Sequence, residues 1–203
     1  DPEAMTYYYI GECYEKLNMF DRALIEYRHA LDVDDKLSEA WMGAGIAMDE
    51  LGHTKEALKF MEKATTIEDI NPEYWYILGD TQAKAGQKEK ALQSYHKVSE
   101  LDPYNPDIWV DQAEILASEE RYEEAVAILE KGVEADPRNA SNIYRKGIYL
   151  IRIGRSREAY AIIERALGID YAKHIELFEY MPQLRDDPAV IGLIDSYRVN
   201  KKK

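Results

Sequence analysis

The sequence predicts an all-α solenoid of five helix-turn-helix repeats, followed by a C-terminal capping segment. The first observation behind this prediction is self-similarity: apolar segments begin with a constant period of 34, at Tyr7, Trp41, Trp75, Trp109 and Ile143. The second is that an alanine and, one helical turn later, a large apolar residue recur with the same period, starting with Ala23 and Tyr27. The third is that residue types common in turns, such as glycine and proline, recur between the apolar segments. We expect the repeats at residues 4–37, 38–71, 72–105, 106–139 and 140–173.

One unit, residues 72–105, shows why each repeat should form two helices. Its first half has apolar or small residues at the i, i+3, i+4 spacing of a buried helical face, at Trp75, Leu78, Gly79 and Ala83. Gly86 interrupts this pattern, and the second half resumes it at Ala91, Leu92, Tyr95 and Val98. Pro103 disfavours helical geometry in Asp102, so the second helix should end there. Each unit is therefore predicted to be helix, turn, helix.

The helix boundaries have candidate capping residues. Before the second helices, Asp21, Thr54 and Ser156 are of the types that cap helix N-termini. Residues 174–203 do not complete a sixth copy of the repeat. There, Asp187 and Pro188 predict the start of a last helix, with an apolar face that would suit a capping element. The lysines at 201–203 are expected to form a solvated basic tail.

Composition limits the function classes. With 39 acidic and 26 basic side chains the net charge is −13, which disfavours nucleic acid as a partner. The charge is uneven, because residues 138–173 carry eight basic and three acidic side chains. No apolar run approaches the length that a bilayer requires, so no membrane span is predicted. The lone Cys13 excludes an intramolecular disulfide, which fits a reducing, cytoplasmic location.

The N-terminal end carries neither an initiator methionine nor a basic leader with an apolar run, so no signal peptide is predicted. It also has no counterpart of the C-terminal cap. We therefore expect the sequence to be a fragment, with further repeats or another domain before residue 1.

The unit at residues 72–105 has a distinctive order of residues, namely Trp75, Leu78, Gly79, Ala91, Tyr95 and Pro103. This order resembles the tetratricopeptide repeat, and the five gapless periods cover about five-sixths of the chain. Two departures concern local packing: Ala113 replaces the first-helix glycine in the fourth repeat, and Ile143 replaces the tryptophan in the fifth. The resemblance implies a right-handed α-solenoid (superhelix) and a role in protein–protein interaction.

Each first helix has two distinct faces. Counting from the first residue of a repeat, positions 4, 7, 8 and 11 share one face, and positions 2, 5, 9 and 12 share another about 130° away. The first face should pack inside the repeat, which makes Trp41, Trp75 and Trp109 structural residues. The second face mixes carboxylates with tyrosine, methionine and isoleucine.

In the family that the chain resembles, the second face lines the concave groove where peptides or partner helices bind. The resemblance implies the following groove candidates: Tyr8, Glu12, Met42, Ile46, Asp49, Tyr76, Asp80, Val110, Asp111, Glu114, Tyr144, Arg145 and Ile148. Two other interpretations stay open. The apolar members could pack against neighbouring first helices, and the acidic ones could form a solvated face. If the groove binds, an acidic and aromatic surface favours a basic and apolar segment.

Some members of the family hold the C-terminal carboxylate of heat-shock chaperones with Lys, Asn and Arg side chains. The corresponding positions of the first three repeats hold Tyr8, Glu12, Gly43, Glu73 and Ile77. Starting from the third repeat they hold Tyr76, Asp80, Asp111, Ser141 and Arg145, and only Arg145 has the required charge. A carboxylate-binding groove is therefore not expected.

No motif points to catalysis, a cofactor or a metal. His29, His53, His96 and His174 lie in different repeats without the i, i+4 spacing of a helical metal site. Cys13 has no adjacent histidine or lysine that would activate a thiolate. We therefore expect a non-enzymatic adaptor or scaffold. Two alternatives remain: a structural or self-assembling part of a longer repeat array, with self-association through the first repeat, and the regulatory arm of a larger protein.

Overall fold

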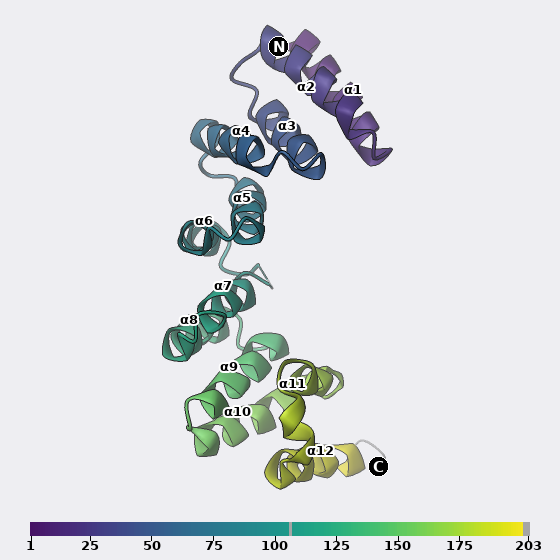
Figure 1. The fold of residues 1–203 in the computed structure, drawn as a ribbon. Coiled ribbons are helices and arrows are strands. Elements are labelled where there is room, and N and C mark those ends of the chain that lie inside the picture. The colour runs from purple at the N-terminus through teal and green to yellow at the C-terminus, as the bar shows by residue number, and fades with distance from the viewer. Residues whose placement is uncertain (106, 201–203) are drawn as a thin grey trace. The chain divides into compact units, whose positions relative to one another are not determined.

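The computed structural model describes residues 1–105 and 107–200, and for residues 199 and 200 it describes the backbone alone. The chain divides into two compact units, the first ending at Leu101 and the second beginning at Asp102. All regular elements in the described residues are helical, as the ribbon in Figure 1 shows. None of the described helices is long and apolar enough to cross a membrane.

The first unit consists of three helical pairs. Their bounds are α1 Pro2–Lys16, α2 Phe20–Val33, α3 Ser38–Glu50, α4 Thr54–Ile67, α5 Pro72–Lys84 and α6 Lys88–Leu101. Within each pair the two helices pack on one another, and α2 and α4 also pack on the first helix of the pair that follows. This is the stacking expected of a repeat array, in which each unit buries its apolar face against its neighbours.

The second unit has two helical pairs and an irregular C-terminal segment. Its elements are α7 Ile108–Ala117, α8 Tyr122–Ala135, α9 Ala140–Arg152, α10 Ser156–Ile169, η1 Ala172–His174, α11 Ile175–Tyr180, η2 Pro182–Asp186 and α12 Pro188–Asn200. The segment from η1 to α12 packs back onto the last pair, with α11 against α9 and α12 against α10. The predicted fold class, an all-α solenoid of helix-turn-helix repeats with a C-terminal cap, is confirmed.

The turn inside each pair repeats with the period of the sequence. Positive φ angles occur once in each turn, at Asn18, Gly52, Gly86, Glu120 and Gly154, which are equivalent positions of the five repeats. In every turn the next backbone N–H reaches back to the first helix, as in the bond from His53 N to Met48 O of 2.9 Å. A residue in the left-handed region with such a bond is a common helix C-terminus. The glycine that interrupts the sequence pattern is therefore the residue that ends the first helix.

The predicted caps of the second helices were wrong, whereas the cap of the last helix is confirmed. Thr54 and Ser156 are already the first helical residues, Asp21 is the second residue of α2, and none of these helices has a side-chain cap. The tight turn leaves no room for a separate capping residue, because the residue after the left-handed one is already the N-cap. In contrast, Asp187 Oδ1 accepts from Ala189 N at 2.9 Å, directly before Pro188 starts α12.

The three tryptophans have the structural role predicted for them. Each indole N–H donates to the backbone carbonyl six residues earlier: Trp41 to Asp35 and Trp75 to Asp69, both at 2.8 Å, and Trp109 to Pro103 at 3.0 Å. These bonds tie the loop before each first helix to that helix.

Candidate functional site

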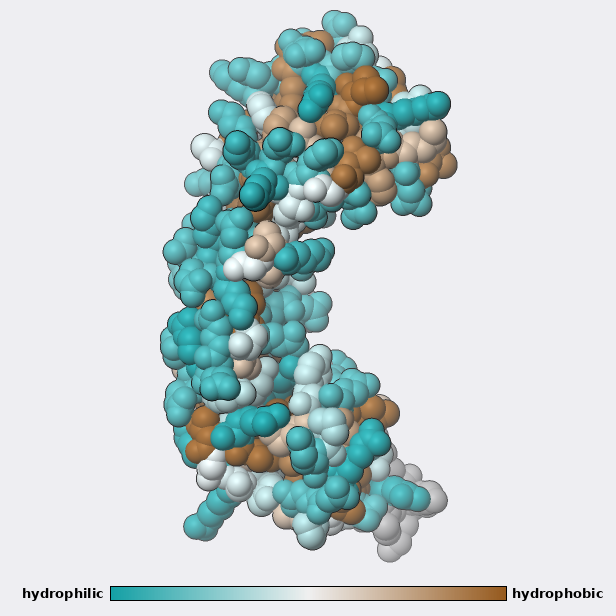
Figure 2. Space-filling model, viewed as in Figure 1, coloured by the Kyte–Doolittle hydropathy of each residue, from teal (hydrophilic) through white to brown (hydrophobic). Residues whose placement is uncertain are grey.

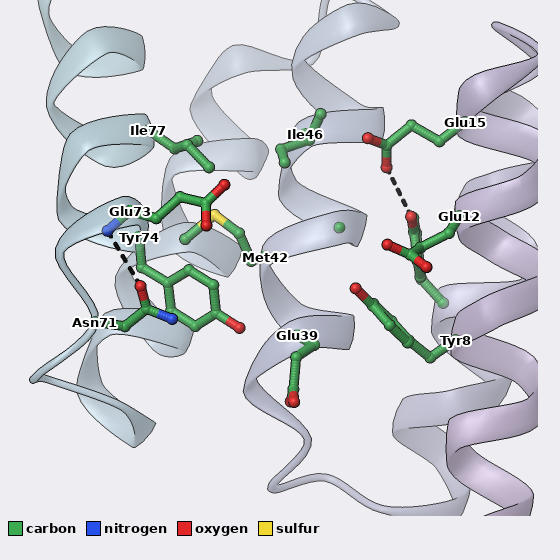
Figure 3. A pocket seen from close by; sticks show the side chains of 12 residues that line it. Tyr8, Glu12, Glu15, Glu39, Met42, Ile46, Asn71, Glu73, Tyr74 and Ile77 are labelled. Atoms are coloured by element: carbon green, nitrogen blue, oxygen red, sulfur yellow. Dashed lines mark hydrogen bonds between the residues drawn. The ribbon is translucent and has the colours of Figure 1, made fainter.

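Several predicted groove residues come together in the first unit, around a cavity of about 400 Å³ between α1, α3 and α5 (Figure 3). We call this the first cavity, and it is lined by Tyr8, Glu12, Glu15, Tyr27, Glu39, Met42, Gly43, Ile46, Asn71, Glu73, Tyr74 and Ile77. Tyr8, Glu12, Met42 and Ile46 belong to the predicted set. Met42 is only 3% exposed, so it packs in the cavity wall rather than standing free.

A smaller cavity of about 150 Å³ adjoins the first, because both are lined by Ile46 and Ile77. Three more predicted residues line it: Asp49, Tyr76 and Asp80. The two cavities lie next to each other along the first helices of the unit, and we call them together the acidic groove. The space-filling view shows hydrophobic patches between hydrophilic side chains over the α1 to α3 part of this unit (Figure 2).

The tyrosines of the first cavity are held neutral. Burial raises the pKa of Tyr8, and the charge of the nearby Glu12 carboxylate adds to this effect. Burial also raises the pKa of Tyr27, whose hydroxyl donates to Glu15 Oε2 at 2.6 Å. Burial raises the pKa of Tyr74 to about 12. The negative charge of the cavity therefore lies on the glutamates, and the phenols serve as hydrogen-bonding groups.

Two acids of the smaller cavity already have partners. Lys84 Nζ lies 2.6 Å from Asp80 Oδ2, and this hydrogen bond raises the pKa of Lys84. Thr54 Oγ1 donates to Asp49 Oδ1 at 2.7 Å. Because Lys84 offsets the charge of Asp80, the smaller cavity is less negative than its sequence indicates, and the first cavity, lined by four glutamates, is the more strongly acidic part of the groove.

The predicted residues of the second unit are arranged differently. Val110, Asp111 and Glu114 are partly exposed on α7. Tyr144, Arg145 and Ile148 on α9 are 0%, 3% and 2% exposed, so the structure corrects their prediction as open groove contacts. The reason is the C-terminal segment, in which α11 and η1 pack against α9 and cover this face.

Polar and ring contacts surround these buried side chains, and the contact of Arg145 with Tyr180 reaches the C-terminal segment. Tyr144 donates from its hydroxyl to the carbonyl of Asp170 at 3.0 Å. The guanidinium of Arg145 lies 2.8 Å from Glu114 Oε1 and 3.0 Å from the ring centre of Tyr180. A charge so deeply buried is tolerated only with such partners. The face of α9 that was predicted to line the groove is therefore covered by the protein's own C-terminal segment.

Sequence reasoning missed several residues of the first cavity. Tyr74 is the clearest case: it stands at position 3 of its repeat, on neither predicted face, and yet lines the cavity. Glu15, Glu39 and Glu73 lie on the predicted second face but were not among the candidates. Their position on that face was a signal that could have found them, whereas the sequence carried no signal for Tyr74.

The described residues offer no metal site, because no group of three or more His, Cys, Asp or Glu side chains among them could hold an ion. Cys13 is exposed. The geometry of the groove provides carboxylates, phenols and apolar walls, which suit binding of a cationic and apolar ligand.

Comparison with known proteins identifies the same repeat. Two models of the tetratricopeptide repeat match the chain, one at residues 5–37 and 38–71, the other at residues 82–146. A search among curated proteins finds no match.

Similar solved structures include YrrB, described as a TPR protein with an unusual peptide-binding site, at 25% identity and a TM-score of 0.68. That alignment covers 87% of this chain and 91% of YrrB. A structure of MamA aligns at 21% identity and a TM-score of 0.71, covering 85% of this chain and 95% of MamA. MamA from Desulfovibrio magneticus RS-1 aligns at 17% identity and a TM-score of 0.67, covering 86% of this chain and 98% of that one.

Proposed function

The chain belongs to the tetratricopeptide repeat family, and from this premise we propose that it is a non-catalytic adaptor whose acidic groove binds a segment of another protein. The observation that carries the proposal is the convergence of Tyr8, Glu12 and Ile46 with Tyr76 and Asp80 on the acidic groove of the first unit. Because successive first helices lie next to one another in a repeat array, side chains from three repeats can contact one ligand at this place.

Charge supports a basic partner. The first unit carries 20 acidic and 11 basic side chains, a net charge of −9, whereas the second carries 19 and 15, a net charge of −4. A segment with lysine or arginine next to apolar residues would therefore be attracted to the first unit in particular. YrrB, which shares the fold, is described as having a peptide-binding site, and this supports binding of a peptide here.

The test is selection from a displayed random peptide library. We expect the protein to enrich peptides that combine basic and apolar residues. The double variant Tyr76→Ala and Asp80→Ala, which removes a ring and a charge from the smaller cavity, should lose most of this capture. Capture by that variant equal to wild type, with the fold verified by circular dichroism, would refute groove binding.

A matched control removes the same groups outside the groove. Tyr104 is 73% exposed after α6, and Asp21 is exposed on α2, and neither lines a groove cavity. The variant Tyr104→Ala and Asp21→Ala has the same change of composition and charge. It should capture the same peptides as wild type.

One observation favours a second candidate, self-association through α1. Ile10 is 39% exposed, whereas the residues at the same repeat position in α3 and α5, Ala44 and Leu78, are 0% and 2% exposed. Tyr9 and Leu17 extend this exposed apolar face. Light scattering over a range of concentrations tests the idea, since a mass that stays at 23.5 kDa excludes it for this chain.

A further inference from the structure

The second unit shows how this repeat array holds a guanidinium. Glu114 stands at position 9 of the fourth repeat, and Arg145 stands at position 6 of the fifth. Their side chains form an ion pair of 2.8 Å, and the Tyr180 ring lies over the same guanidinium. Position 9 of one repeat therefore faces position 6 of the next.

The first unit has the same acid at the equivalent place without the arginine. Position 9 of the first repeat is Glu12, position 6 of the second is Gly43, and both line the first cavity. A Cβ atom at Gly43 would lie 2.5 Å from Cζ of Tyr27, so no side chain fits at this position beside that ring. The first unit therefore has the acidic residue of the pair, Glu12. At position 43 it has no room for a basic side chain that could pair with Glu12.

The next pair along the groove is apolar. Position 9 of the second repeat is Ile46 and position 6 of the third is Ile77, and these two residues join the first cavity to the smaller one. A ligand that reaches Glu12 with a charged group would thus place its adjoining residue against two isoleucines.

The first cavity also presents several acceptors from different directions. Figure 3 shows the hydroxyls of Tyr8 and Tyr74 pointing toward one another across the cavity, with Glu12 beside Tyr8 and Glu73 on the side of Tyr74. A guanidinium has five N–H donors in one plane, whereas a lysine ammonium is a compact and more strongly hydrated charge. Acceptors spread around a partly buried space of about 400 Å³ therefore suit arginine better than lysine.

We propose that the first cavity binds the guanidinium of an arginine from the partner segment, in the place that Arg145 fills in the second unit. An apolar residue next to that arginine then packs against Ile46 and Ile77. This assignment rests on the proposed function and adds to it the residue that anchors the ligand.

The experiment titrates three capped tripeptides into ¹⁵N-labelled protein and follows the backbone amide signals. The peptides are Leu-Arg-Leu, Leu-Lys-Leu and Leu-citrulline-Leu, in which citrulline has the shape of arginine without its charge. We expect the arginine peptide to shift the amide of Gly43 and its neighbours in the first cavity. Its dissociation constant should be at least about tenfold lower than that of the citrulline peptide, a difference of about 1.4 kcal/mol.

Two variants locate the contact. Glu12→Gln should weaken binding of the arginine peptide about tenfold, whereas Glu56→Gln, the same change at an exposed site on α4, should leave it unchanged. The double variant Tyr27→Leu and Gly43→Arg recreates the combination of Leu129 and Arg145 found in the second unit. It should fill the cavity from within and abolish binding, with circular dichroism confirming the fold.

Each contrary result has a defined meaning. Equal binding of the arginine and citrulline peptides would overturn the guanidinium assignment while leaving groove binding intact. Equal binding of the lysine peptide would overturn the preference for arginine. An equal loss in Glu56→Gln would mean attraction by net charge alone, and no shift with any peptide would also overturn the inference. In every case the proposed function is tested separately, by the library selection with the Tyr76→Ala and Asp80→Ala variant.

Discussion

Gly43 is the residue at which the fold and the candidate site depend on one another most directly. Its missing side chain lets the ring of Tyr27 approach, and that ring forms part of the wall of the first cavity. Gly11 meets the same ring from the other side, with an added Cβ lying 2.6 Å from Tyr27 Cε1. The ring is thus enclosed between two helices that are close because they lack side chains there.

We expect Gly43→Ala to destabilise the protein by about 1–3 kcal/mol, because the new methyl group must displace a tightly packed ring. Urea unfolding followed by circular dichroism measures this. Gly192→Ala in α12 is the matched control, since an added Cβ there meets nothing within 4 Å. That variant should be unchanged or slightly more stable, because alanine favours helix over glycine. A Gly43→Ala protein as stable as wild type would show that the ring moves aside without cost.

The buried tyrosines predict how stability depends on pH. Burial raises the pKa of Tyr8, Tyr27 and Tyr144 above the ordinary value, and that of Tyr74 to about 12. Because the folded pKa exceeds the unfolded one, the stabilisation is fully present below about pH 10 and is lost as pH rises through the folded values. Unfolding should therefore become easier between about pH 10 and 12.

Stability against urea at a series of pH values, together with tyrosinate absorbance in the near ultraviolet, checks this. The Tyr144→Phe variant should lose less stability than wild type over that interval, because position 144 no longer carries a phenol that ionises once the chain unfolds. Tyr104→Phe is the control, since Tyr104 is 73% exposed and does not belong to the buried phenols. A stability that stays level to pH 12 would contradict the prediction.

At the scale of the element, the turn between paired helices is the most regular feature. Four of the five residues with positive φ are glycine or asparagine, which adopt this conformation readily, and the fifth is Glu120 with φ of 61°. A glutamate there is strained because its Cβ crowds the following carbonyl. The other four turns show that the fold favours glycine or asparagine at this position.

Glu120→Gly should therefore stabilise the α7 and α8 pair by about 1 kcal/mol, against the usual trend of glycine substitutions. Thermal unfolding of the variant measures the effect. The reverse change at the equivalent position, Gly86→Glu, should destabilise the protein by a similar amount. If both variants lost stability, the strain at Glu120 would be offset by contacts of its side chain.

The packing of whole helices also decides which of the predicted groove residues are accessible to a ligand. The inner face of α3 is bordered by α1 and α5 with a cavity between them, whereas the inner face of α9 is covered by α11 and η1. The same repeat positions are therefore cavity walls in one unit and core in the other. Arg145 is the clearest case, since its charge is buried only because Glu114 and Tyr180 lie against it.

At the scale of the whole molecule, charge is the dominant property. The net charge of −13 is distributed as −9 and −4 between the two units. Most ion pairs in the described residues are between exposed side chains of the same helix or its flanking turn, such as Arg155 with Glu158 and Lys97 with Glu100. Pairs of this kind contribute little to stability, so repulsion among the excess acids is not fully offset.

We expect the melting temperature to rise by about 2–4 °C between roughly 0.01 M and 0.3 M NaCl, as screening relieves that repulsion. Differential scanning calorimetry measures this. A variant that neutralises three exposed acids in the last turns of their helices, Asp32→Asn, Glu50→Gln and Glu134→Gln, should melt higher than wild type at low salt and respond less to added salt. A melting temperature that falls with salt would show that attractive pairs outweigh the repulsion.

The sequence by itself determined the period, the helix-turn-helix unit, the structural tryptophans and the cap at Asp187, because each follows from local spacing or from the residue types at a boundary. The helical period also grouped the residues of α1, α3 and α5 that line the acidic groove, because side chains on one side of a helix lie next to one another.

Only the tertiary structure decided which of those faces stays open and what completes the site. Tyr74 joined the first cavity from a position that the helical pattern assigned to neither face, and α11 closed the face of Tyr144, Arg145 and Ile148. The physical reason is that a repeat pattern specifies the neighbours within the array. The irregular segment after residue 171 follows no period, so its packing against α9 depends on contacts that sequence spacing does not encode.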